Sequence, residues 1–217
     1  MLKRNLATVF LACLSSSCIA ADLFRPEEIN AGEHYIELKE SVSDAPVVIE
    51  FFSFYCQPCY GFTYQHKVNE HVTAVLPPRY RAERYHVSST GSMGKALTEA
   101  WSVARALGVE AKVEGLLYDA VQCKKITPSE KEIQKVFMDA GVSEIDYKNA
   151  KDSFQVKALT RKQDEMAEKF GVNGTPSYYV AGKYLIINSG IKAKHYQTYG
   201  HAYANVVYRL IKKNQTL

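Results

Sequence analysis

The segment VVIEFFSFYCQPC, residues 47–59, constrains the fold more strongly than any other part of this sequence. Residues 47–54 are an almost unbroken apolar and aromatic run, which is typical of a central strand buried on both faces. Helical spacing of apolar residues follows the two cysteines over 60–75 and ends at a pair of prolines. The sequence therefore predicts a strand that passes into a helix at a Cys-x-x-Cys pair, in a β-α-β unit closed by a strand at 79–87.

A helical block interrupts this α/β pattern. Residues 93–108 have helical spacing and end in a glycine, Thr127 to Glu130 read as a helix cap with Pro128 at the first position, and another helix is expected over 155–170. Strand patterns are expected at 33–38 and, around a turn at Ala181-Gly182, at 177–186, with a last helix at about 195–213. We therefore expect a signal peptide at 1–20, an α/β domain built from 21–88 and 164–217, and an inserted helical domain at 89–163.

Residues 1–20 have the order of a cleavable secretory signal. Lys3 and Arg4 provide a basic start, an uncharged apolar run follows, and small residues lead to Ala20. The apolar run is too short for a membrane helix, which needs about 20 apolar residues. We expect cleavage after Ala20 and an exported mature chain of about 197 residues.

Charge and cysteine content narrow the classes of function. Without Lys3 and Arg4 the 27 basic residues fall to 25, against 23 acidic ones, and the two kinds are interleaved. Nucleic-acid binding needs basic clusters, so we expect no nucleic-acid partner. Of the 5 cysteines, the mature chain keeps Cys56, Cys59 and Cys123. A disulfide-held scaffold would carry more cysteines, in even number, so one pair and an odd thiol favour redox chemistry.

The Cys56–Cys59 pair admits three interpretations: a redox couple, half of a zinc site, or a structural disulfide. A helix N-terminus favours a thiolate, the reactive species in disulfide exchange. Cys56 is then the attacking, exposed thiol, and Cys59, one turn later, the buried thiol that resolves a mixed disulfide. Zinc needs four ligands, and the spacing of His66 and His71 does not put both on one helix face, so we expect no metal. A structural disulfide that closes so short a loop stabilises little.

Two further residues are candidates for the same site. Glu50 interrupts a run suited to burial, where an unpaired carboxylate is costly, and we expect it to be a buried proton acceptor near Cys59 rather than a solvent-facing strand residue. Thr175-Pro176 precedes a strand and is either an ordinary turn or a cis-proline. In the second case it presents the backbone of Thr175, beside the cysteines, to a bound peptide.

Together these motifs resemble the DsbA family of periplasmic thiol–disulfide oxidoreductases. The resemblance rests on EFFSF before the Cys-x-x-Cys, the ALTEAW and ALGVE segments, Gly-x-Pro before a strand, and AGKY, and it covers essentially the mature chain. It implies a thioredoxin fold with an inserted α-helical domain, oxidation of reduced exported proteins, and reoxidation by a membrane partner of the DsbB type. Cys56 matches the nucleophile, Cys59 the buried thiol, Glu50 the buried acid and Pro176 the cis-proline. We expect no cofactor and a monomer.

The chain departs from the family's Pro-His dipeptide, because Gln57 and Pro58 stand between the thiols. This dipeptide lacks the histidine, and the nitrogen of Pro58 cannot donate to the sulfur of Cys56. We expect a less acidic Cys56 and a weaker oxidant than the Pro-His members. Thr175, where a common form has valine, adds a hydroxyl near the sulfurs.

Other functions stay open at this point. A thioredoxin-like reductant is possible because Pro58 is shared with the Gly-Pro dipeptide of thioredoxin, and a substrate-specific chaperone or other binding module could keep the same fold. A DsbC-type isomerase is disfavoured because only about 35 mature residues precede Cys56, too few for a dimerisation domain. Cys123 is expected to be a partly buried thiol without a role.

Overall fold

Five strands form one mixed sheet in the order β1-β5-β4-β2-β3. The computed structural model describes residues 28–123, 129–193, 195 and 198–215, so the predicted signal at 1–20 lies outside the described residues. The strands are β1 (Tyr35–Glu37), β2 (Val48–Phe52), β3 (Ala82–His86), β4 (Ser177–Val180) and β5 (Tyr184–Ile186). β2 pairs in parallel with β3 and antiparallel with β4, as expected when a helix connects the first pair.

Strand β2 lies inside this sheet, between β4 and β3, and all of its residues are buried. Ile49 and Phe51 pack with Met166 and Phe170, at and just beyond the end of α7 (Phe154–Lys169). Because side chains alternate along a strand, Glu50 points to the opposite face. That face is covered by α2 (Val68–Val75) and α8 (Tyr199–Gln215). The prediction of a central strand buried on both faces is confirmed.

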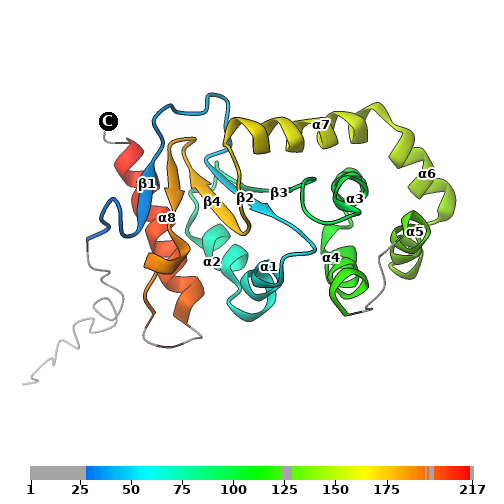
Figure 1. Cartoon of the computed structure of the whole chain (residues 1–217), viewed down its shortest axis with the longest axis horizontal. Coiled ribbons are helices and arrows are strands. Elements are labelled where there is room, and N and C mark those ends of the chain that lie inside the picture. Colours follow the sequence, from blue (N-terminus) through cyan, green and yellow to red (C-terminus); the bar gives the residue numbers. More distant parts are fainter. Residues whose placement is uncertain (1–27, 124–128, 194, 196–197, 216–217) are drawn as a thin grey trace, which may run out of the picture.

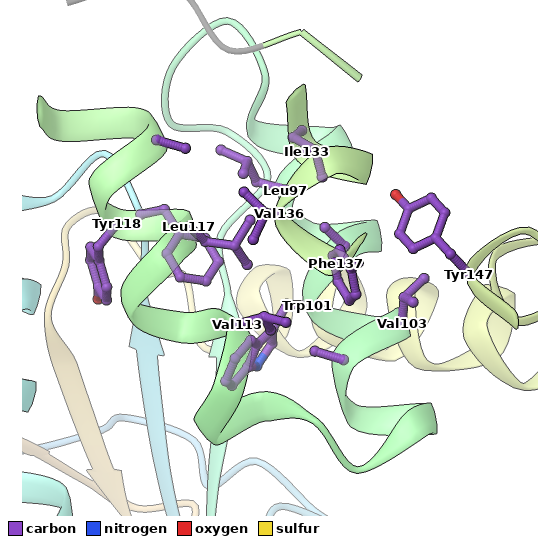
Figure 2. Packing of buried hydrophobic residues seen from close by; sticks show 14 of the residues in the cluster. Leu97, Trp101, Val103, Val113, Leu117, Tyr118, Ile133, Val136, Phe137 and Tyr147 are labelled. Carbon is purple, nitrogen blue, oxygen red and sulfur yellow. The ribbon is translucent and has the colours of Figure 1, made fainter. Parts of the chain in front are cut away.

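The helices between β3 and β4 build a second core beside the sheet (Figure 1). They are α3 (Gly94–Leu107), α4 (Glu110–Tyr118), the π-helical turn η2 (Asp119–Cys123), α5 (Glu130–Asp139), α6 (Glu144–Asp152) and α7. Figure 2 shows Leu97 and Trp101 of α3, Val113 and Leu117 of α4, and Phe137 of α5 meeting in this core. Trp101 is therefore a core residue of the helical block.

The hairpin between β4 and β5 turns at Ala181 and Gly182, as predicted. Both residues have positive φ, 53° and 64°, and a side chain at Gly182 would place its Cβ only 2.4 Å from the carbonyl oxygen of Val42.

In the described part of the chain, no helix is both long and apolar enough to cross a membrane.

Two predictions about helix boundaries were wrong. The single helix expected over 60–75 is interrupted: α1 (Gln57–Tyr60) continues into the π-helical turn η1 (Gly61–Gln65), and Lys67 is left-handed, with φ 50°, before α2 begins. The π-helical turn adds a residue to the repeat, so the residues after it no longer continue the register of α1.

The cap of α5 also differs from the prediction. Thr127 and Pro128 lie outside the described residues, and Ser129 is the N-cap. Its hydroxyl accepts a hydrogen bond from the backbone N–H of Glu132, and the Glu132 carboxylate accepts one from the N–H of Ser129 at 2.7 Å. The capping box is therefore present, but two residues later than expected.

Candidate active site

The two cysteines lie where β2 ends and α1 begins. Cys56 is the N-cap of α1, half-buried, and its sulfur accepts a hydrogen bond from the backbone N–H of Cys59 at 3.1 Å. Cys59 is completely buried, and the two residues are joined in a disulfide. The more accessible sulfur is therefore the one at the helix N-terminus, where the peptide dipoles and the N–H of Cys59 stabilise a thiolate on the reduced pair.

The Thr175-Pro176 peptide bond is cis and lies against the disulfide. The carbonyl oxygen of Thr175 is 3.2 Å from Sγ of Cys56, although 119 residues separate them in sequence. Asn188 fixes the position of this segment. Its side-chain N–H donates to the carbonyl of Pro176 at 2.8 Å, and its Oδ1 accepts from the hydroxyl of Tyr203. The structure thus brings Thr175 and Pro176 to the cysteines, with the cis-proline that the resemblance implied.

Gln57 and Pro58 are exposed and line a cavity of about 860 Å³ beside the disulfide. The cavity continues along Tyr60 to the η2 turn of the helical block. Cys123 lines its far end and is exposed, so the prediction of a partly buried thiol was wrong. Cys123 is the last residue of the short η2 turn, which leaves its side chain at the surface rather than in a helix–helix contact.

Glu50 is buried, with 1% of its surface exposed, as the apolar run around it predicted. Its neighbour across the parallel ladder is Arg84 of β3, whose Nε donates to Oε2 of Glu50 at 2.6 Å. Arg84 also donates to the carboxylate of Glu114 at 2.8 Å. Burial alone would lower the pKa of Arg84, but the two carboxylates raise it well above the ordinary value, so the guanidinium stays charged.

His86, at the end of β3, fixes the backbone just before the cysteines. Its Nε2 accepts a hydrogen bond from the N–H of Phe54 at 3.1 Å, which leaves Nδ1 as the nitrogen that donates to the hydroxyl of Thr98 at 2.8 Å. Burial lowers the pKa of His86 to about 3, so the ring is neutral and this pattern of donor and acceptor holds at neutral pH.

Sequence reasoning missed Arg84, His86 and Glu114 as members of the site. The sequence did contain a signal for Arg84. The strand predicted at 79–87 pairs with the run that contains Glu50, and a buried carboxylate needs a cationic partner, which a neighbouring strand can provide. The sequence contained no such signal for Glu114, because only the packing of α4 against the sheet brings Glu114 to Arg84.

A mixed sheet, a disulfide at a strand-to-helix junction and a cis-proline against its outer sulfur define a thioredoxin-fold thiol:disulfide oxidoreductase. The family model of the DSBA-like thioredoxin domain matches residues 47–197. The chain therefore belongs to the DsbA family, and it carries the helical insertion between β3 and β4 that the resemblance implied.

Individual relatives agree with this assignment. The chain is similar to the thiol:disulfide interchange protein DsbA of Pectobacterium carotovorum subsp. carotovorum, 41% identical over 86% of this chain and 90% of the relative. The DsbA of Yersinia pestis is 42% identical over 81% of this chain and 85% of its own length. Among solved structures, the disulfide oxidoreductase DsbA from Proteus mirabilis superposes with a TM-score of 0.83 at 40% identity, over 85% of this chain and 98% of that one.

Proposed function

We propose that this oxidoreductase introduces disulfides into reduced exported proteins in the periplasm through a mixed disulfide at Cys56. A client thiolate attacks Sγ of Cys56, the Cys56–Cys59 bond breaks, and Cys59 leaves as a thiolate that takes up a proton. A second client thiolate then attacks the client sulfur of the mixed disulfide, so that the client gains a disulfide and Cys56 leaves reduced. Two electrons pass from the client to the cysteine pair.

The observation that carries this proposal is the contrast between the two sulfurs. Cys56 is accessible and has an N–H donor, whereas Cys59 is fully buried, so a client reaches the first and not the second. The carbonyl of Thr175, 3.2 Å from the Cys56 sulfur, supports a role for Thr175 and Pro176 in pairing with the backbone of a bound client. A Proteus mirabilis DsbA, 40% identical to this chain, has been solved with the non-covalently bound peptide PWATCDS, which supports a peptide as substrate.

Glu50 acts in the return half of the cycle. When the reduced pair is reoxidised, the partner first forms a mixed disulfide with Cys56, and the buried Cys59 thiol must lose its proton before it can attack. Glu50 is a buried carboxylate whose Oε1 has no hydrogen-bond partner among the described residues, and it serves as the acceptor of that proton. The reoxidant is a membrane protein of the DsbB type, and the oxidoreductase works as a monomer after cleavage of residues 1–20.

Transfer of the disulfide to a reduced model protein tests this function. The Cys56→Ser/Cys59→Ser double variant is expected to lose all catalysis over the uncatalysed rate, and Cys123→Ser to keep it. Cys59→Ser, mixed with a disulfide-bonded client, accumulates a mixed disulfide visible on a non-reducing gel, and Cys56→Ser does not. A double variant that retains the full biological activity would instead identify a binding module.

A further inference from the structure

A cluster of three charged side chains lies buried between the sheet and the helical insertion. Its members are Glu50 of β2, Arg84 of β3 and Glu114 of α4, with side chains 1%, 17% and 11% exposed. Arg84 bridges the two acids, through Nε to Glu50 at 2.6 Å and through Nη1 to Glu114 at 2.8 Å. Two carboxylates therefore share one guanidinium in a largely buried site.

This charge count is unusual for a purely structural contact. With both acids ionised the cluster carries a net charge of −1, and burial of an uncompensated charge is costly, so the cluster gains by binding a proton. Burial raises the pKa of Glu114 against the opposing effect of Arg84. In a purely structural ion pair, both carboxylate oxygens of Glu50 would be expected to accept hydrogen bonds. In the described part of the chain, Oε1 of Glu50 has no hydrogen-bond partner.

The cluster is also next to the turn that carries Cys59. Thr63 is four residues after Cys59, in the π-helical turn that continues α1, and its hydroxyl accepts from Nη2 of Arg84 at 3.3 Å. The ring of Phe52, packed in the same core as Cys59, lies 4.6 Å from the Arg84 guanidinium. The cluster therefore contacts both the turn that follows Cys59 and the core in which the buried thiol packs.

The other titratable groups that face the cluster are tyrosines. They come from η1, α4, β4 and α8: Tyr64, Tyr118, Tyr178 and Tyr203. Burial raises the pKa of each, so all four stay neutral near pH 7 and do not change the charge count.

We propose that Glu114 is a positioning residue for the redox centre: it holds Nη1 of Arg84, so that the guanidinium meets Glu50 through Nε alone and Oε1 of Glu50 is left to take the proton of Cys59. The helical insertion thereby sets the pH range in which the pair is reoxidised. In the step concerned, the S–H bond of Cys59 breaks and an O–H bond forms on Glu50. The Cys59 thiolate then attacks Sγ of Cys56, and the partner leaves as a thiolate. This inference rests on the proposed role of Glu50.

The pH profile of reoxidation by glutathione disulfide, followed by the fluorescence of Trp101, tests the inference. Glu114→Gln keeps the shape of the side chain and its hydrogen bond to Arg84 but removes its charge. Glu50 is then the only carboxylate in the cluster that is paired with Arg84. We expect the acid limb of the profile to move down by about one pH unit or more, the usual effect of a neighbouring charge. Glu114→Asp, which keeps the charge, and Glu110→Gln, a charge change on the same helix outside the cluster, should leave the limb in place.

The variants separate the inference from the function on which it rests. If the pH profile of reoxidation is the same for Glu50→Gln and for the original protein, Glu50 is not the proton acceptor, and the proposed function loses that step. If the acid limb of the profile moves in Glu50→Gln but not in Glu114→Gln, the inference about Glu114 is overturned and the role of Glu50 stands. The same holds if Glu114→Gln is less stable than the original protein but has its acid limb at the same pH. If Glu114→Gln does not fold, NMR titration of the side-chain carboxyl carbons decides: coupled transitions of Glu50 and Glu114 are expected, and independent ones would contradict the inference.

Discussion

We expect Gln57 and Pro58 to limit how much of the Cys56 sulfur is thiolate once the pair is reduced. The structure places Cys56 at the helix N-cap with a single backbone donor on its sulfur, the N–H of Cys59 at 3.1 Å. Pro58 lies between them and has no N–H to add, and the exposed Gln57 carries no charge. The helix terminus therefore stabilises the thiolate with less help than a histidine beside the sulfur would give.

Replacing Gln57-Pro58 by Pro-His tests this directly. The exchange restores a cationic ring near the sulfur, and we expect the titration midpoint of Cys56, read from thiolate absorbance near 240 nm, to fall by about one pH unit. Gln65→His, a change of the same kind outside the dipeptide, serves as the control. An unchanged midpoint, or an original protein already as acidic as Pro-His members, would show that the dipeptide does not limit thiolate formation.

At the scale of elements, the junction between β2 and α1 and the strand β3 beside it could be predicted from the sequence, but the contacts that β3 makes could not. The apolar run, the Cys-x-x-Cys and the burial of Glu50 follow from local pattern, and so does the turn at Ala181-Gly182. The role of β3 depends on register: it brings His86 to the backbone of Phe54, and no local pattern in RYRAERYHV encodes that contact. Packing across the sheet, rather than propensity, decides such positions.

The buried ring of His86 makes stability depend on pH. Its folded pKa of about 3 lies below the ordinary value of 6.5, so the unfolded chain binds the proton first. This contribution is fully present above pH 6.5 and is lost as the pH falls toward 3. The free energy of unfolding should drop by up to about 1.4 kcal/mol per pH unit in that window from this group alone.

Urea denaturation between pH 7 and pH 4 measures this slope. His86→Gln offers an acceptor to Phe54 but cannot titrate, so its stability should fall less steeply than that of the original protein. His34→Gln, at a more exposed histidine, is the matched control. Parallel slopes for the original protein and His86→Gln would contradict the assignment of this pH dependence to His86.

At the scale of the whole molecule, α7 joins the two parts that the sequence predicted as separate domains. The proposed boundary at residue 164 falls inside α7, whose Val156 belongs to the core of the helical block while Met166 packs against β2. Helix periodicity predicts such an element but not which core each of its ends enters. The ion pair between Arg84 of β3 and Glu114 of α4 links the same two parts.

The redox equilibrium of the Cys56–Cys59 pair with glutathione tests the central claim that this protein donates disulfides. In defined ratios of reduced and oxidised glutathione, the pair is expected to remain largely reduced until the buffer is strongly oxidising, which corresponds to a potential well above the roughly −270 mV of thioredoxin. A potential at the thioredoxin value would contradict the claim, because a pair that holds its disulfide so firmly acts as a reductant of other proteins.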